Sequence, residues 1–197
     1  MNYLAHAYLS FKHEEILVGN VISDFIKGKK KFDYPEPIQK GIALHRAIDE
    51  FTDTHEATKM AKKTFRPHYR LYSGAFVDVV YDHFLANDNN EFSEETLNDF
   101  SRKVYKTLDK YSSYFPARFA RMFPYMKIQN WLFNYRTRSG TESSFGGLVR
   151  RAQYLTESNT ATALFEENYQ QLQHCYQLFF PEVKSFAYTF YLDIIKS

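Results

Sequence analysis

Residues 71–85, Leu71-Tyr-Ser-Gly-Ala-Phe-Val-Asp-Val-Val-Tyr-Asp-His-Phe-Leu85, decide the fold class. Apolar residues cover almost the whole circumference that a helix of 3.6 residues per turn would present, which is typical of a helix buried in a bundle. Asp78 and Asp82 fall one turn apart on the apolar stripe, so both carboxylates are expected to be at least partly buried. Such a group needs a cation, hydrogen-bond donors or a proton. Metal ligation and pairing with an arginine such as Arg46 or Arg66 both satisfy this requirement.

Helical patterns extend over nearly the whole chain. Gly (7 residues) and Pro (6) are too scarce for the turns of a many-stranded sheet. We predict one all-α domain over residues 1–197, a helical bundle with a softer Ser/Gly-rich stretch at 139–147. The helices are expected over residues about 3–13, 15–27, 36–53, 56–65, 70–87, 94–112, 160–179 and 182–195, with the last two separated at Pro181.

The composition excludes several classes of protein. The 25 basic and 23 acidic residues leave a net charge of +2, which argues against a dedicated nucleic-acid binder. An aromatic content of 18% excludes disorder. The single cysteine, Cys175, excludes an internal disulfide and a multi-thiolate zinc site, and it is expected to pack in the core. With no targeting segment and no apolar run long enough to span a membrane, we expect a cytoplasmic protein.

A second stretch, Gly41-Ile-Ala-Leu-His-Arg-Ala-Ile-Asp-Glu-Phe-Thr-Asp-Thr-His55, also combines an apolar stripe with polar residues. His45 and Asp49 lie four positions apart, beside the core-facing stripe, so an imidazole and a carboxylate can face one cation. Asp53 lies a little further round the helix. On spacing alone, the simpler interpretation is a surface helix with a His–Asp hydrogen bond.

The same four-residue spacing occurs twice more near the N-terminus. Asn20 and Asp24 interrupt an otherwise apolar helix, and Asn2 and His6 do so in the first one. One such pair is ordinary in a core, but four helices with such pairs favour one shared site of imidazole and carboxylate ligands. Without cysteine, these ligands suit Mn²⁺, Fe²⁺ or Mg²⁺ better than structural zinc.

These motifs resemble those of the acyl carrier protein phosphodiesterase family, in the same order and over nearly the whole chain. A tryptophan-containing segment at 129–136 and a basic stretch at 147–151 also look like the family. The matching runs are Asn2-Tyr-Leu-Ala-His6, Gly19-Asn-Val-Ile-Ser-Asp-Phe25, His45-Arg-Ala-Ile-Asp-Glu-Phe-Thr-Asp53 and Asp78-Val-Val-Tyr-Asp-His-Phe-Leu85.

The resemblance implies an all-α relative of the HD phosphohydrolases that depends on a divalent metal, usually Mn²⁺. The implied reaction removes 4′-phosphopantetheine from holo acyl carrier protein by hydrolysing its phosphodiester to serine. HD enzymes carry adjacent His-Asp, whereas this chain has the reversed order Asp82-His83. The expected metal ligands are therefore drawn from this chain's own motifs: His6, Asp24, His45, Asp49, Asp82 and His83.

Other residues receive supporting roles under this hypothesis. Asp78 or Asp53 would act as base or orient a ligand. Arg46 would hold the phosphate, although a surface salt bridge explains it equally well. Asn2 and Asn20 would orient ligands.

The implied substrate also predicts a docking surface, because acyl carrier proteins are small and strongly acidic. The lysine loop, Lys27 with Lys29, Lys30 and Lys31, follows Asp24 and is the first candidate. The pair Arg150 and Arg151 is the second candidate. Plain solvation of an exposed loop is the alternative.

Two other functions agree with the same sequence. The chain could hydrolyse a nucleotide or another small phosphoester, although it lacks a P-loop motif. It could also be a non-enzymatic helical adaptor whose His–Asp pairs satisfy one another. Retention of a divalent ion would exclude the adaptor, and a substrate panel would separate the two enzymes.

Overall fold

The prediction of an all-α protein is confirmed. The computed structural model describes residues 1–196, and every regular element within that range is helical. Four short 3-10 helices, η1 (Ser23–Phe25), η2 (Gly28–Asp33), η3 (Arg70–Tyr72) and η4 (Ser112–Tyr114), join some of the α-helices. The α-helices are α1 (Tyr3–Tyr8), α2 (Glu14–Ile22), α3 (Glu36–Thr54), α4 (Glu56–Tyr69), α5 (Ser73–Ala86), α6 (Glu94–Lys110), α7 (Ala117–Ile128), α8 (Trp131–Asn134), α9 (Arg138–Arg151), α10 (Asn159–Glu167) and α11 (Tyr169–Lys196).

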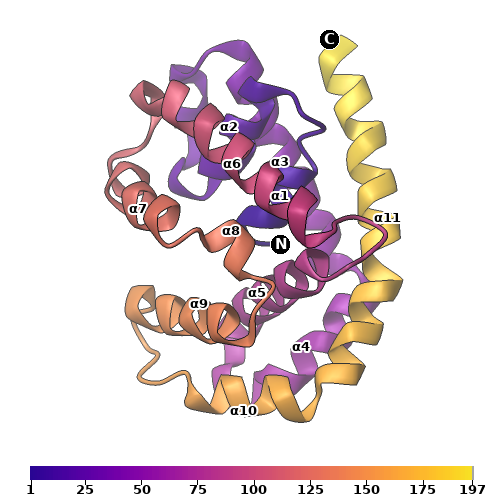
Figure 1. The fold of residues 1–197 in the computed structure, drawn as a ribbon. Helices are drawn as coiled ribbons and strands as arrows, with labels where there is room; N and C mark the ends of the chain where they lie inside the picture. Colours follow the sequence, from indigo (N-terminus) through magenta and orange to yellow (C-terminus); the bar gives the residue numbers. More distant parts are fainter. Residues whose placement is uncertain (197) are drawn as a thin grey trace.

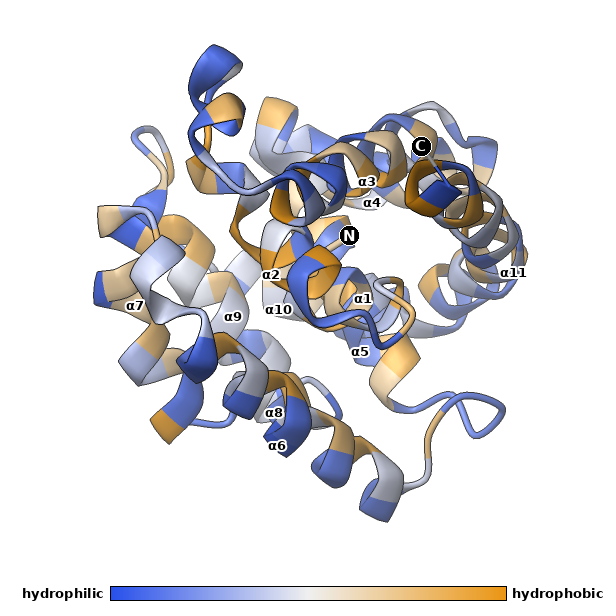
Figure 2. Ribbon diagram, turned by 90° about the horizontal axis from the view of Figure 1, so that it is seen from above, coloured by the Kyte–Doolittle hydropathy of each residue, from blue (hydrophilic) through white to orange (hydrophobic). Residues whose placement is uncertain are grey.

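The helices form a bundle around one continuous hydrophobic core. Helix α2 packs on α3, while α11 runs along one side of the molecule and packs on α3, α4 and α5 (Figure 1). In the view from above, hydrophilic stretches lie on the outward faces of helices such as α6 (Figure 2). Helix α5 is almost entirely buried, as its sequence predicts, and Phe76, Val80 and Leu85 are among its core residues. Helix α1 packs on α2 and α5, and Met1, just before it, lies beside Asp49 of α3.

The first two helices are shorter than predicted. Helix α1 ends at Tyr8, and it cannot extend to residue 13 because Phe11 and Lys12 adopt left-handed backbone conformations, with φ of 50° and 64°. Helix α2 ends at Ile22, and the 3-10 helix η1 carries the chain through Asp24. The early stop of α2 turns Asp24 out of the regular helix.

The predicted helix break at Pro181 is wrong. The break between α10 and α11 lies at Asn168, whose side chain donates to the Leu164 carbonyl, and α11 continues for 28 residues. Proline removes one helical hydrogen bond, but the neighbouring Phe180 and Val183 are buried, which offsets that loss. No helix within residues 1–196, α11 included, is long and apolar enough to cross a membrane.

The Ser/Gly-rich stretch at 139–147 is also helical rather than soft. It belongs to α9, whose first turn is capped by the Thr137 hydroxyl accepting from the Gly140 N–H at 2.9 Å. Phe145 of α9 is fully buried, so tertiary packing overrides the weak helix propensity of serine and glycine. Ser93 caps the start of α6, and Cys175 is buried as expected.

Candidate metal centre

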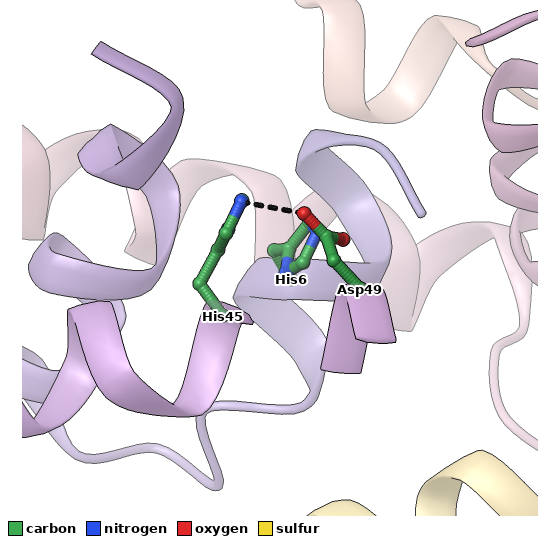
Figure 3. A group of neighbouring side chains, drawn as sticks. All are labelled: His6, His45 and Asp49. Atoms are coloured by element: carbon green, nitrogen blue, oxygen red, sulfur yellow. Dashed lines mark ion pairs between the residues drawn. The ribbon is translucent and has the colours of Figure 1, made fainter. Parts of the chain in front are cut away.

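Three side chains from two helices converge near the N-terminus. His6 comes from α1, and His45 and Asp49 come from α3 (Figure 3). His6 Nε2 lies 3.2 Å from Asp49 Oδ1, and His45 Nε2 lies 3.0 Å from Asp49 Oδ2. The rings of His6 and His45 are stacked, with centroids 4.0 Å apart. The histidine cluster, as we call these three residues, brings its potential ligand atoms within 4.8 Å of one another.

Asn20 fixes the orientation of both imidazoles. Its backbone carbonyl accepts from His45 Nδ1 at 2.7 Å, and its side-chain oxygen faces His6 Nδ1 at 2.7 Å. The amide nitrogen of Asn20 donates elsewhere, to the His6 carbonyl and the Ser10 hydroxyl, so its oxygen is the acceptor for His6. Each histidine therefore donates from Nδ1 and directs Nε2 toward Asp49, the arrangement in which metal-binding histidines are commonly held.

The close crossing of α2 and α3 brings Asn20 to His45. At the crossing, a Cβ on Gly41 would lie 2.2 Å from the Ile16 carbonyl oxygen and 2.9 Å from the Gly19 Cα. A Cβ on Gly19 would lie 2.1 Å from the Ile38 carbonyl oxygen. Only glycine permits this backbone approach. It places the carbonyl of Asn20, which follows Gly19, against His45, one helical turn after Gly41. Both glycines lie within the sequence motifs described above, but the sequence alone did not predict this close helix crossing.

Burial and charge act against each other in the cluster. Burial lowers the pKa of His45, but hydrogen bonds to Asp24 and Asp49 outweigh it and raise the pKa to about 9. The pKa of His6 is lowered, by burial and by the neighbouring His45. Burial raises the pKa of Asp49, but the two imidazoles hold it well below its usual range. Without a metal, the site therefore holds an ionised Asp49 between a neutral His6 and a protonated His45, whose Nε2 proton a cation would displace.

The chemistry of these donors fits a divalent cation. His6 Nε2 is buried and has no hydrogen-bond partner in the described chain, because its contact with Asp49 lacks hydrogen-bonding geometry. The Asp49 side chain is 41% exposed, so the cluster is reached from solvent. Asp24 adds a second carboxylate, with Oδ1 3.1 Å from His45 Nε2 and a side chain that is 64% exposed. Two imidazoles with one or two carboxylates suit a divalent ion such as Mn²⁺ or Fe²⁺.

Asp82 lies outside the cluster and accepts hydrogen bonds from the backbone at the start of α1. Its two oxygens accept from the backbone N–H groups of Asn2, Leu4 and Ala5 at 3.3, 2.8 and 3.2 Å. The side chain thus caps the first turn of α1, the helix that carries His6. Burial raises the pKa of Asp82 to about 7, although these donors act in the opposite direction.

His83 is directed away from the cluster, into the packing of α5 on α8, α9 and α11. Its Nδ1 lies 2.8 Å from the Tyr135 carbonyl and 3.1 Å from the Thr141 hydroxyl. Its Nε2 lies 3.0 Å from the Tyr169 hydroxyl. Burial lowers the pKa of His83 to about 4, so the ring is neutral near pH 7. The structure therefore does not bring this predicted ligand to the histidine cluster.

Asp78 and Asn2 border the cluster. Asp78 Oδ1 accepts from the Met1 amino group at 2.7 Å, and the same amino group lies 4.0 Å from Asp49 Oδ1. Burial raises the pKa of Asp78, although the Met1 ammonium opposes this shift. The Asn2 side chain accepts from the Tyr3 N–H and so caps α1 rather than contacting an imidazole.

Arg46 and Asp53 lie on α3 but face away from the ligand atoms. Arg46 Nη2 donates to the Ile26 carbonyl at 3.3 Å, a contact to the segment just after Asp24. Asp53 pairs with Lys62 at 2.7 Å, and its side chain is 71% exposed. The α3 sequence thus holds two acidic residues one turn apart, of which only Asp49 reaches the cluster.

The basic candidates lie at two separate places. Lys29 and Lys30 are exposed on η2 and Lys31 is half-buried there, immediately after the Asp24 segment. Arg150 and Arg151 end α9 and line a cavity of about 710 Å³ beside the start of α1. The sequence did not predict that Tyr3 and Trp131 form the other wall of that cavity. Both are aromatic residues of the family-like motifs at 2–6 and 129–136, and their presence there was the only sequence feature that pointed to them.

The fold and the site define a class: a helical protein with a candidate metal centre of two histidines and one carboxylate near its N-terminus. The sequence pattern of the family described as acyl carrier protein phosphodiesterase matches residues 1–183. The chain belongs to this family.

Individual relatives support this membership. A Yersinia pestis protein named acyl carrier protein phosphodiesterase is 31% identical over 182 residues, covering 92% of this chain and 94% of the relative. A protein of the same name from Klebsiella pneumoniae subsp. pneumoniae is 30% identical over 188 residues, covering 95% and 97%. No solved structure matches significantly, so the expected relation to HD phosphohydrolases stays a prediction.

Proposed function

We propose that this protein is a metal-dependent phosphodiesterase that removes 4′-phosphopantetheine from holo acyl carrier protein. The family match and the names of the relatives support the carrier protein as substrate. The chemistry rests on one observation: two buried imidazoles, both oriented by Asn20, direct Nε2 toward the same carboxylate.

His6, His45 and Asp49 would hold the metal, with Asp24 as the candidate fourth ligand. Mn²⁺ is the metal we propose, with Mg²⁺ and Fe²⁺ as alternatives, because the donors are imidazole and carboxylate without thiolate. When bound, such an ion lowers the pKa of water and neutralises charge on phosphoryl oxygens.

The remaining residues would support this centre. Asn20 keeps each imidazole in the tautomer that leaves Nε2 free for a cation. Asp24 is exposed and lies beside His45 Nε2, so, if it does not ligate, we assign it to accept a proton from the attacking water. We assign Asp82 and His83 to support of the fold, because their polar atoms already have partners in the protein.

The lysine loop would dock the acidic carrier protein. Lys29 and Lys30 are exposed on η2, Lys31 is half-buried beside them, and all three follow Asp24 closely in the chain. Rim charges act mainly on encounter rate and salt dependence. Changing the three lysines to glutamate should therefore raise the KM for holo carrier protein and leave turnover of a small phosphodiester unchanged.

The direct test is incubation with holo acyl carrier protein and Mn²⁺, followed by mass measurement of the carrier. The proposal predicts loss of the phosphopantetheine arm, with no comparable hydrolysis of a nucleotide panel. Asp49→Asn should remove the activity, while Asp53→Asn, a change of the same type one turn along α3, should keep it. An unchanged carrier mass with the wild-type protein and added Mn²⁺ would contradict the proposal.

A further inference from the structure

The cavity beside the histidine cluster has the size and the walls of a ligand site. It measures about 710 Å³ and lies between the start of α1 and helices α8 and α9. Binding sites for small ligands commonly occupy about 300–1,000 Å³. Side-chain amides of Asn2 and Asn134 and hydroxyls of Ser143 and Ser144 line it together with the Trp131 ring. These walls suit a flexible molecule with amide and hydroxyl groups.

Two arginines give the cavity its charge. The Arg150 guanidinium lies over Gly146 and Gly147, where a Cβ would meet it at 3.3 and 3.7 Å. Arg151 donates from Nε to the Gly147 carbonyl at 3.1 Å. Neither arginine forms an ion pair with the described chain. Glu142 is the one acidic residue in the lining, so the described walls carry a net positive charge.

One end of the cavity lies beside the cluster. Asn2 and Tyr3 line it, and the Asn2 carbonyl accepts the first helical hydrogen bond of α1, from the His6 N–H at 3.1 Å. Burial raises the pKa of Tyr3 to about 12, while Arg151 lowers it and Asp24 raises it. The Tyr3 hydroxyl donates to Met122 Sδ at 3.7 Å, and Arg151 Nη1 donates to the same sulfur at 3.6 Å, so Tyr3 and Arg151 lie close together at this end of the cavity.

We propose that this cavity binds the phosphopantetheine arm, with Arg150 and Arg151 on its phosphate and the amide and hydroxyl walls along its chain. This inference rests on the proposed function and adds where the arm lies. A guanidinium matches two phosphoryl oxygens, and both arginines lack a competing carboxylate. The phosphate would then lie toward the cluster-facing end, where Arg151 and Tyr3 both contact Met122.

The only tryptophan in the chain provides a readout independent of catalysis. Trp131 lines the cavity, so its fluorescence reports on occupancy. We would titrate the purified full-length protein with 4′-phosphopantetheine, with pantetheine lacking the phosphate, and with inorganic phosphate. Phosphopantetheine should change the fluorescence and bind at least about tenfold more tightly than pantetheine, because a charge-assisted hydrogen bond contributes roughly 1.5–3 kcal/mol.

Two variants test the walls separately. Arg150→Gln should weaken phosphopantetheine binding about tenfold and leave pantetheine binding unchanged. Gly147→Leu should remove binding of both, because the Cβ has space and the larger side chain would enter the cavity without a backbone clash. Arg102→Gln, at an exposed arginine of α6 outside the cavity, is the matched control and should bind like the wild type.

The outcomes separate this inference from the proposed function. If the wild type releases the arm from holo carrier protein but Arg150→Gln and Gly147→Leu bind phosphopantetheine normally, the cavity assignment is overturned and the function stands. If the wild type fails on carrier protein while both variants weaken phosphopantetheine binding, the function is overturned and the cavity remains the binding site. Equal binding of phosphopantetheine and pantetheine would overturn the role of the arginines.

Discussion

Two pairs of histidine and carboxylate look alike in the sequence and differ in the structure. In the histidine cluster, Nδ1 of His6 and of His45 is occupied by Asn20, and Nε2 is directed at a carboxylate that reaches solvent. In the α5 pair, Asp82 and His83, all hydrogen-bonding side-chain atoms face groups of the fold itself. The presence of imidazole and carboxylate is therefore less informative than which of their atoms remain available.

The carboxylates of the histidine cluster and of the α5 pair also differ in solvent exposure. The Asp49 side chain is 41% exposed, whereas Asp82 is 0% exposed. A buried carboxylate that accepts from three backbone N–H groups stabilises the start of a helix. A half-exposed carboxylate between two imidazoles can exchange those contacts for an ion. Changes at Asp49 should therefore affect metal binding more than stability, and changes at Asp82 should affect stability more than metal binding.

Breaking the helix crossing beneath the cluster should have the largest effect on stability. Gly41→Ala would place a Cβ 2.2 Å from the Ile16 carbonyl oxygen, a backbone atom that cannot move aside cheaply. Separation of α2 from α3 would also pull Asn20 from His45. We expect the free energy of unfolding, measured with urea, to fall by about 3 kcal/mol or more.

Gly147→Ala is the matched control for this change. The added Cβ there would meet only the flexible Arg150 side chain, at 3.7 Å. Alanine also has the better helix propensity, so stability should stay the same or rise slightly. Equal stability of Gly41→Ala and the wild type would show that the crossing does not require glycine.

The two kinds of histidine should give the metal-free protein opposite pH dependences. The pKa of His45 is raised to about 9, so its contribution is complete below about pH 6.5 and is lost as the pH rises through 9. The pKa of His83 is lowered to about 4, so stability is lost as the pH falls from about 6.5 toward 4. Each effect is up to about 3 kcal/mol.

Single variants assign these two limbs. His45→Gln should flatten the alkaline limb and His83→Gln the acidic limb of the unfolding free energy, measured from pH 4 to 10 with a chelator present. Loss of the alkaline limb in His83→Gln, with the acidic limb intact, would reverse the assignment.

Removing the buried carboxylate of α5 should have an intermediate effect. Asp82→Ala leaves the N–H groups of Leu4 and Ala5 without their acceptor, so we expect a loss of about 2 kcal/mol in urea unfolding. The folded variant should still take up Mn²⁺. Wild-type stability with complete loss of Mn²⁺ binding would instead identify Asp82 as a ligand.

The smallest effect is expected at the exposed end of α3. Asp53 pairs with Lys62 at the surface, and such pairs contribute roughly 0–1 kcal/mol. Asp53→Asn should change the unfolding free energy by about 0.5 kcal/mol or less and leave Mn²⁺ affinity unchanged. A tenfold loss of Mn²⁺ affinity would place Asp53 in the metal site.

The sequence predicted the helices better than it predicted their ends. Periodicity identified most helices, because burial of an apolar face is a local pattern. The boundary at Asn168 and the helix α9 were missed, because Phe145 and the residues around Pro181 are stabilised by distant helices.

The candidate site was predicted in part for a similar reason. The pair His45 and Asp49 lies on one helix, so spacing alone brings it together. The partners of His83 come from residues 135, 141 and 169, far along the chain, and no local pattern reveals them. Which polar atoms stay available is a property of tertiary packing.

Mn²⁺ binding tests the central claim most directly. The wild type and three variants, His45→Gln, Asp49→Asn and His83→Gln, would be titrated with Mn²⁺, and free Mn²⁺ would be followed by its electron paramagnetic resonance. We predict that His83→Gln, if folded by circular dichroism, binds Mn²⁺ like the wild type, while His45→Gln and Asp49→Asn lose at least about tenfold in affinity. Wild-type affinity in Asp49→Asn, or loss of binding confined to His83→Gln, would contradict the assignment of the histidine cluster as the metal centre.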